Sequence, residues 1–255
     1  MKTIRLLPIA LIAAALPAAA EPFAQIRDAD GYAYIRATPD TKGRIVAKMP
    51  SGGYVYAPEG DGGDFRSGQW QTVYYSDTKG YIKEGWMHGS RLNNIGSHRK
   101  IPVKITADGF SCMHNGIGLT VKVGKFDYRA HRRDFRDRKG AVPAAAAEFP
   151  SIDVYRGKTV FGTDGQMPTT HYRSITFTRK GQTVAVAPAA FEHLFNPYFD
   201  SLSELRHGNA CYYRADDETF FLSAQNSDGA AVYNVLFVFE KGRLKKVLPM
   251  LHPEA

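Results

Sequence analysis

Four short stretches decide the fold: YAYIRATP at residues 32–39, IVAKMPSG at 45–52, GQWQTVYY at 68–75 and GWMHGSRL at 85–92. They are short, rich in strand-forming residues, and separated by turn sequences that contain glycine, proline or aspartate. Because side chains alternate along a strand, Tyr34 should point to the face opposite Ile35. No helical period appears between residues 24 and 93. This part of the chain is therefore predicted to be a small β module.

These stretches resemble the bacterial SH3 domain, a small barrel found in many exported bacterial proteins. The family's opening strand is matched by residues 34–39, its second strand and turn by 45–52, its tryptophan strand by 70–73, and its closing Gly-Trp pattern by 85–92. Tyr34 stands where the family usually has Asn, and the loops around Asp61 and Lys83 are longer than usual. The resemblance implies a barrel at residues 24–93 that binds peptidoglycan stem peptides or bridges, or another extended peptide.

Aromatic side chains are the candidate ligand contacts of this module. Flat rings give a large contact area at a low cost in conformational entropy, and their polar tips orient a ligand. The candidate binding residues are Tyr34, Tyr54, Tyr56, Trp70, Tyr74 and Trp86. The alternative for Trp70 and Trp86 is a partly buried core position, which makes the tyrosines the better candidates.

Residues 1–20 have the features of a secretory signal peptide. Lys2 and Arg5 form a positive start, residues 6–16 form a short apolar run, and residues 18–20 form a small-residue cleavage site. The apolar run is shorter than the roughly 20 residues that span a bilayer, and no cysteine follows it for lipidation. We therefore expect no membrane anchor and a periplasmic or secreted protein.

The charge of the chain favours an anionic partner. The formal net charge is +8, and removal of the signal peptide with Lys2 and Arg5 would leave about +6. A cell-wall polymer or an acidic protein suits this charge. Nucleic acid is not expected as a partner, because secretion removes that target and no basic face is interleaved with stacking aromatics.

Cys112 and Cys211 are the two cysteines of the chain. In an exported protein, two cysteines are more often bonded than free, because the compartment is oxidising. We therefore predict a disulfide between them. It would join the first strand of a second domain to a late strand of the same domain.

Residues 101–255 are predicted to form that second domain, after a polar linker at residues 94–100. Pro188 and the following helix-forming residues predict one short helix over 188–195, which ends at Asn196-Pro197. The strand candidates are residues 101–107, 118–128, 152–154, 172–178, 183–187, 211–214, 219–224, 231–240 and 244–248. The predicted fold class is mostly β: a small SH3-like barrel followed by an antiparallel β-rich (α+β) domain with one short helix.

The run RAHRRDFRDRK at residues 129–139 is the sharpest charge feature of the second domain. Arginine binds carboxylates and phosphates through two parallel hydrogen bonds, so this run is a candidate surface for an anionic partner. The candidate binding residues in it are Arg132, Arg133 and Arg136. The alternative is a solvated segment in which Asp134 and Asp137 pair with arginines of the same run. Residues 141–150 are expected to be a flexible or helical connector.

Neither catalysis nor a cofactor nor a metal site is expected. Cys112 with His171 or His193 would imitate a thiol peptidase, but the sequence around Cys112 lacks the Asp-Cys-Ser-Gly pattern of papain-like wall peptidases. The histidines are not spaced to place two metal ligands on one helix face. Asp28 and Asp30 are better explained by a turn than by a calcium loop.

Three hypotheses about function follow from the sequence. The leading one is an exported, non-enzymatic protein whose barrel docks on peptidoglycan or on an extended peptide. The second is an immunity or inhibitor protein that neutralises a secreted toxin that degrades the cell wall. The third and weakest is a wall hydrolase that uses Cys112.

Overall fold

The computed structural model describes most of the chain after the predicted signal peptide. The described residues are 21–58, 68–77, 82–136, 153–163, 166–199 and 208–251. The predicted signal peptide, the acidic loop with Asp61 and Asp64, and the connector at 141–150 lie outside them. None of the helices in the described part has the length and apolar composition to cross a membrane.

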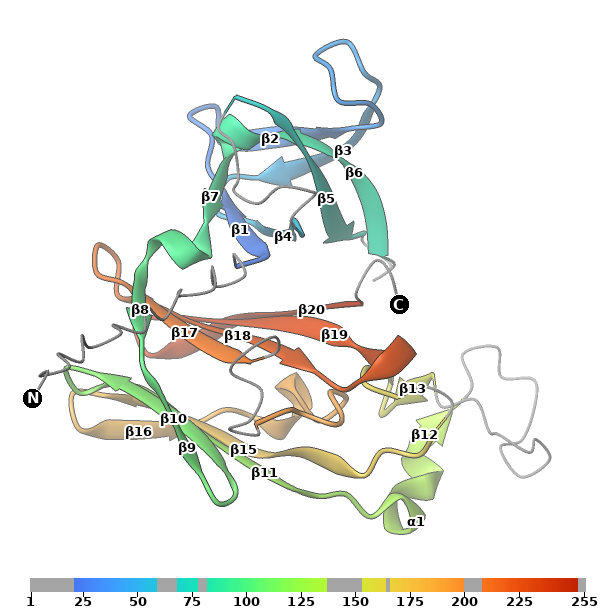
Figure 1. The fold of residues 1–255 in the computed structure, drawn as a ribbon, viewed down its shortest axis with the longest axis vertical. Coiled ribbons are helices and arrows are strands. Elements are labelled where there is room, and N and C mark those ends of the chain that lie inside the picture. The colour runs from blue at the N-terminus through green and yellow to red at the C-terminus, as the bar shows by residue number, and fades with distance from the viewer. Residues whose placement is uncertain are drawn as a thin grey trace, which may run out of the picture.

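The N-terminal part of the chain forms one sheet of seven strands, coloured blue to green in Figure 1. Its strands, in hydrogen-bonded order, are β3 (Ile45–Pro50), β2 (Tyr32–Arg36), β6 (Ile82–His88), β5 (Trp70–Ser76), β4 (Tyr54–Tyr56), β1 (Phe23–Ile26) and β7 (Leu92–Asn94). All pairings in it are antiparallel. Among the described residues, β3 and β7 are its two edges, so its hydrogen bonding is that of an open sheet and not of a closed barrel.

The rest of the chain forms three more antiparallel sheets. The central sheet contains β20 (Arg243–Leu251), β19 (Tyr233–Glu240), β18 (Thr219–Asn226), β17 (Asn209–Arg214) and β8 (Arg99–Ile101). The outer sheet contains β16 (Gln182–Ala185), β15 (Thr170–Arg179), β11 (Ile117–Lys125), β10 (Gly109–His114) and β9 (Val103–Thr106). A small sheet contains β12 (Phe135–Arg136), β13 (Val154–Tyr155) and β14 (Lys158–Thr159). The predicted mostly antiparallel β fold is confirmed.

The three large sheets lie in layers, with the central sheet between the other two (Figure 1). Leu236 and Val238 of β19 face the N-terminal sheet and share a core with Phe23 and Tyr56. The alternate residue Phe237 faces the outer sheet. Both faces of β18 and β19 are thus buried, which explains the nearly unbroken apolar run at residues 231–240.

Tight hairpins connect consecutive strands of the second half. Lys180 and Gly181 both have positive φ, 51° and 77°, between β15 and β16. Lys241 and Gly242 have φ of 49° and 87° between β19 and β20. Two successive residues with positive φ form the turn whose twist matches that of antiparallel strands.

Two expectations about the second half are corrected. Residues 188–195 do not form a helix: only the 3₁₀ turn η4 (Pro188–Ala190) is present, and the chain then extends to bridge at Leu194 and Phe195. Burial of Leu194 and Phe195 in different clusters explains this. The one short α-helix in the described residues is α1 (Tyr128–His131), which overlaps the start of the basic run.

The stretch at residues 94–100 is not a free linker. It contains the 3₁₀ turn η2 (Ile95–Ser97) and most of β8, which pairs with β17 of the central sheet. Ile95 is fully buried between the N-terminal and central sheets. The polar composition of the stretch gave no sign of this packing, because Ile95 is the one buried side chain that anchors it. The other 3₁₀ turns among the described residues are η1 (Gly89–Arg91), η3 (Arg132–Asp134) and η6 (Gly229–Ala231).

The predicted disulfide is present. Cys112 on β10 is bonded to Cys211 on β17, so the bond joins the outer sheet to the central sheet. Both cysteines are buried in the core between these sheets. The bond fits an oxidising compartment outside the cytoplasm.

We predict that removal of this bond strongly lowers stability. The two cysteines are 99 residues apart, and closing so long a loop restricts the unfolded chain by about 5 kcal/mol in the chain-entropy model. The double variant Cys112→Ala/Cys211→Ala should therefore unfold at a lower urea concentration than the oxidised protein. Reductant should shift the wild-type midpoint towards that of the variant and leave the variant unchanged. Equal midpoints for oxidised and reduced protein would contradict the prediction.

Candidate functional site

One face of the N-terminal sheet carries most of the aromatic residues singled out in the sequence. On β2, Tyr32, Tyr34 and Arg36 are partly exposed, whereas the alternating Ala33 and Ile35 are buried. The pleat of the strand therefore sends the tyrosines to the face opposite the core of this sheet. We call the partly exposed residues Tyr32, Tyr34, Trp70 and Trp86 the aromatic face.

The neighbouring strands place both tryptophans on this face. Trp86 of β6 lies opposite Arg36 of β2 on one side and opposite Thr72 of β5 on the other. Trp70 lies opposite His88, and their rings meet edge to face at 5.5 Å. Residues directly opposite in a sheet share one face, so the two tryptophans and the tyrosines of β2 form one surface.

Contacts between rings and cations fix the side chains of this face. Tyr32 and Tyr34 meet edge to face at 5.2 Å. The ammonium of Lys48 lies 3.6 Å from the centre of the Tyr32 ring, and the guanidinium carbon of Arg36 lies 5.8 Å from that of Tyr34. Such contacts are favourable because the ring face is electron-rich. The surface therefore combines ordered rings with positive charge.

A glycine makes the position of Trp86 possible. The preceding Gly85 is buried, and a Cβ atom there would collide with Ile35 and with the backbone of Arg36. Strands β2 and β6 can approach only without a side chain at this point. The Gly-Trp pair of the sequence is thus explained by the packing of these two strands.

The other half of the same surface is covered by the central sheet. Tyr54 and Tyr56 are 8 % and 2 % exposed and belong to the core shared with β18, β19 and β20. The hydroxyl of Tyr56 accepts a hydrogen bond of 3.0 Å from Asn234. Tyr74 is partly buried against the same core. Tyr54 and Tyr56, predicted as ligand contacts, are therefore contacts between the two halves of the protein.

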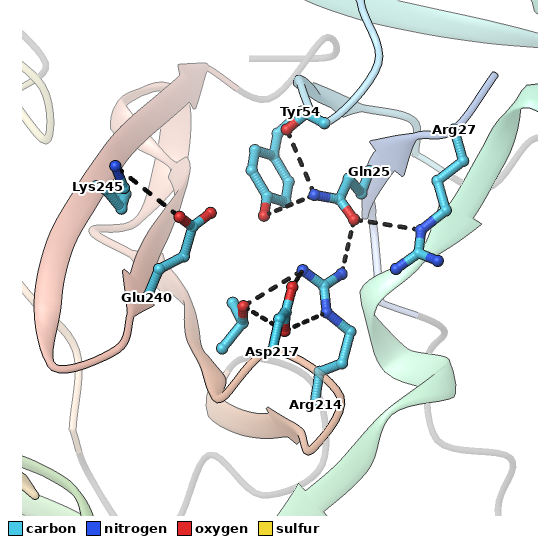
Figure 2. A network of polar contacts seen from close by, with 9 residues as sticks. Gln25, Arg27, Tyr54, Arg214, Asp217, Glu240 and Lys245 are labelled. Carbon is cyan, nitrogen blue, oxygen red and sulfur yellow. Dashed lines mark hydrogen bonds and ion pairs between the residues drawn. The ribbon is translucent and has the colours of Figure 1, made fainter. Parts of the chain in front are cut away.

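A polar network closes one end of the junction between these halves (Figure 2). Arg214 of β17 donates to Gln25 of β1 over 2.6 Å and to both carboxylate oxygens of Asp217, over 2.9 and 2.7 Å. Gln25 in turn donates to the hydroxyl of Tyr54 over 3.0 Å. The buried groups Gln25, Arg214 and Tyr54 thus each have a partner, which burial requires.

Burial and hydrogen bonding shift the pKa values of several side chains at the junction. Hydrogen bonds from Arg214 lower the pKa of Asp217 to about 2. Burial raises the pKa of Tyr54 to about 12. Burial also raises the pKa of Glu21 to about 7, although its carboxylate accepts a hydrogen bond of 2.7 Å from Ser223 of the central sheet.

A cleft of about 570 Å³ lies beside this network. We call it the junction cleft; its lining residues are Gln25, Arg27, Asp28, Ala29, Ser51, Gly52, Arg91, Arg214 and Asp217. Arg91 forms an ion pair of 3.1 Å with Asp28. None of the cleft's arginines was singled out in the sequence. They come from three distant segments, so no local pattern could have found them.

The described part of the basic run lies on α1, η3 and β12, which follow β11 of the outer sheet. Arg132, Arg133 and Arg136 are exposed, as predicted for a surface. Asp134 does not pair with them: its ion pairs are to Arg156, at 2.9 Å, and to His131, at 3.4 Å. Within the described residues, the three arginines therefore have no ion pair. Asp137 lies outside the described residues.

The sulfur of Cys112 is bonded to Cys211, so it is not a free thiol that could act as the nucleophile of a thiol peptidase. Burial lowers the pKa of His193 to about 4, and it lowers the pKa of His171 as well. No group of three His, Cys, Asp or Glu side chains in the described residues is arranged to hold a metal ion.

Comparison with known proteins gives no match: no family model, no curated protein and no solved structure matches the chain.

We predict that Asp217 stabilises the protein in a pH-dependent way. Its folded pKa of about 2 lies below the ordinary value of 3.8, so its contribution is present above pH 3.8 and is lost as the pH falls towards 2. Asp217→Asn should lower the free energy of unfolding at pH 7 by roughly 1 kcal/mol, a modest figure because 46 % of the side chain is exposed and screened by solvent. Urea unfolding should show this difference shrinking as the pH falls to 2.

The exposed neighbour Asp216 offers a matched control. Asp216→Asn removes the same charge without touching Arg214 and should change stability little at any of these pH values. A constant difference between Asp217→Asn and wild type down to pH 2 would contradict the proposed origin of the effect.

Proposed function

We propose that this protein is an exported, non-enzymatic binding protein that holds a peptide on its aromatic face. The carrying observation is that Tyr34, Trp70 and Trp86, separated by up to 52 positions in the sequence, form one partly exposed surface on rigid strands. The likeness to bacterial SH3 domains supports cell-wall peptides or another extended peptide as the ligand. That likeness rests on the motif residues at 34–39 and 85–92.

The charge beside the rings supports a peptide that carries carboxylates. Lys48 and Arg36 lie against Tyr32 and Tyr34, so an acidic group bound there would find a cation next to an apolar surface. Peptides with acidic side chains or a free carboxyl end have this combination of features. Ordered aromatic rings bind such ligands with little loss of side-chain entropy.

The disulfide supports a binding role over the alternative of a thiol hydrolase. Cys112 spans the core between two sheets as a structural link, and its sulfur is therefore not a nucleophile. Export agrees with this bond, because structural disulfides persist in oxidising compartments. The inhibitor hypothesis shares these features and differs only in the partner, which would be a secreted wall-degrading enzyme.

We predict that the aromatic face, and not the buried tyrosines, determines ligand binding. In a pull-down with purified peptidoglycan, wild-type protein should sediment with the polymer. The double variant Tyr34→Ala/Trp86→Ala should lose roughly 90 % of this retention, since loss of two aromatic contacts costs about 1.4 kcal/mol or more, which is a tenfold loss of affinity. Urea unfolding of the same variant tests whether it remains folded.

Two control variants separate binding from stability. Tyr198 is an exposed aromatic residue of the second half, and Tyr198→Ala should bind as wild type does. Tyr56→Phe removes the hydrogen bond to Asn234 and should lower stability by about 1 kcal/mol without affecting retention. If wild-type protein does not sediment, but forms a tight complex with a secreted wall-degrading enzyme, the inhibitor hypothesis replaces this proposal.

A further inference from the structure

The junction cleft contains more positive than negative charge. Arg27, Arg91 and Arg214 line it together with two acids, Asp28 and Asp217. Both acids are already engaged by other groups. Asp217 accepts two hydrogen bonds from the guanidinium group of Arg214. Asp28 forms an ion pair with Arg91 and accepts a hydrogen bond of 2.9 Å from the backbone amide of residue 30. The positive charge of Arg27 is therefore not balanced by an acid of the cleft.

Two guanidinium groups converge on one neutral oxygen. The side-chain oxygen of Gln25 accepts from Arg214 over 2.6 Å and from Nε of Arg27 over 3.4 Å, as Figure 2 shows. In the part of the chain that the structure describes, Arg27 has no carboxylate partner. Like charges that share a neutral acceptor repel each other, so an anion bound beside them would be stabilised.

Arg27 and Arg91 have donors to spare on the open side of the cleft. The terminal nitrogens of Arg27 have no acceptor among the described residues, and Arg91 uses one of its nitrogens for Asp28. The backbone amide of Arg27 donates to the carbonyl of Arg91 over 2.8 Å, so both side chains start from neighbouring points of the backbone. The side chain of Arg91 is 48 % exposed. A ligand can therefore reach both guanidinium groups.

We propose that the junction cleft is a second binding site, which takes a carboxylate between Arg27 and Arg91. A planar carboxylate matches the fork geometry of guanidinium, and a volume of about 570 Å³ leaves room for the end of a peptide or an acidic side chain. The site is made by β1 and the residues that follow it, the β3–β4 turn, η1, the end of β17 and the β17–β18 turn. None of the aromatic-face residues contributes to it. Its occupation is thus separate from the proposed peptide binding on the aromatic face.

Titration with short peptides tests this site. The probes are N-acetylated trialanine with a free carboxyl end, the same peptide as a C-terminal amide, an N-acetylated and amidated Ala-Glu-Ala peptide, and inorganic phosphate. Binding is followed by the NMR signals of the arginine Nε–Hε groups. The free-acid peptide should saturate the Arg27 signal, and Arg27→Gln or Arg91→Gln should weaken its binding by roughly tenfold, the value of a charge-assisted hydrogen bond.

The controls make each outcome decisive. Arg44→Gln removes an equal charge from another exposed position and should bind the probe unchanged, as should Tyr34→Ala/Trp86→Ala. Preference for the free acid over its amide assigns a peptide end as ligand, whereas equal binding of the amidated Ala-Glu-Ala peptide assigns acidic side chains. The proposal is overturned if the neutral amide of trialanine binds as well as its free acid. It is also overturned if phosphate binds more tightly than every carboxylate, if Arg44→Gln weakens binding as much as Arg27→Gln, or if no probe saturates.

Discussion

Burial of both faces of the central sheet is the constraint on which the rest of the structure depends. Strands β18 and β19 have almost no exposed residue, so each face must be covered by another sheet. The outer sheet covers one face and the N-terminal sheet covers the other. Without the N-terminal sheet, Phe221, Leu236 and Val238 would face water. The N-terminal module is therefore part of the core of the second half, and not an independent attachment.

Apolar contact alone would let the sheets slide over each other, since the hydrophobic effect has little directionality. Three polar residues of the central sheet restrict this freedom. Asn234 bonds to Tyr56, Ser223 to Glu21 and Arg214 to Gln25. A shift of the N-terminal sheet would leave these buried groups without partners, at a cost of about 1 to 3 kcal/mol each. Hydrogen bonds thus determine the orientation that burial makes favourable.

Much of the fold follows from local sequence patterns. The dipeptides at 180–181 and 241–242 predict hairpins because glycine permits positive φ, and the alternation in YAYIR predicts which side of β2 is buried. The same alternation could have added Tyr32 to the candidate residues. The disulfide was predicted because the signal peptide indicates export to an oxidising compartment. In each case the signal lies within a few residues or in the composition.

What the sequence did not reveal depends on contacts between distant segments. Alternation identifies the two faces of β4, but it does not show that a second sheet covers one of them, so Tyr54 and Tyr56 were assigned to a ligand. The helix expected at 188–195 had suitable ends, yet tertiary burial of Leu194 overrides helix propensity. The ion pair between Asp134 and Arg156 joins residues that are 22 positions apart in the sequence, which no local pattern encodes.

The covered and uncovered aromatic residues belong to one continuous surface of the N-terminal sheet. The rings of β1 and β4 pack on the central sheet together with Tyr74 of β5, whereas the aromatic face of β2, β5 and β6 remains partly exposed. The uncovered rings therefore stand on strands that are anchored by the buried ones, and they need no ligand to become ordered. A ligand on this surface would meet a preformed site, which lowers the entropy cost of binding. The packing that completes the core of the central sheet thus also holds the proposed binding surface in place.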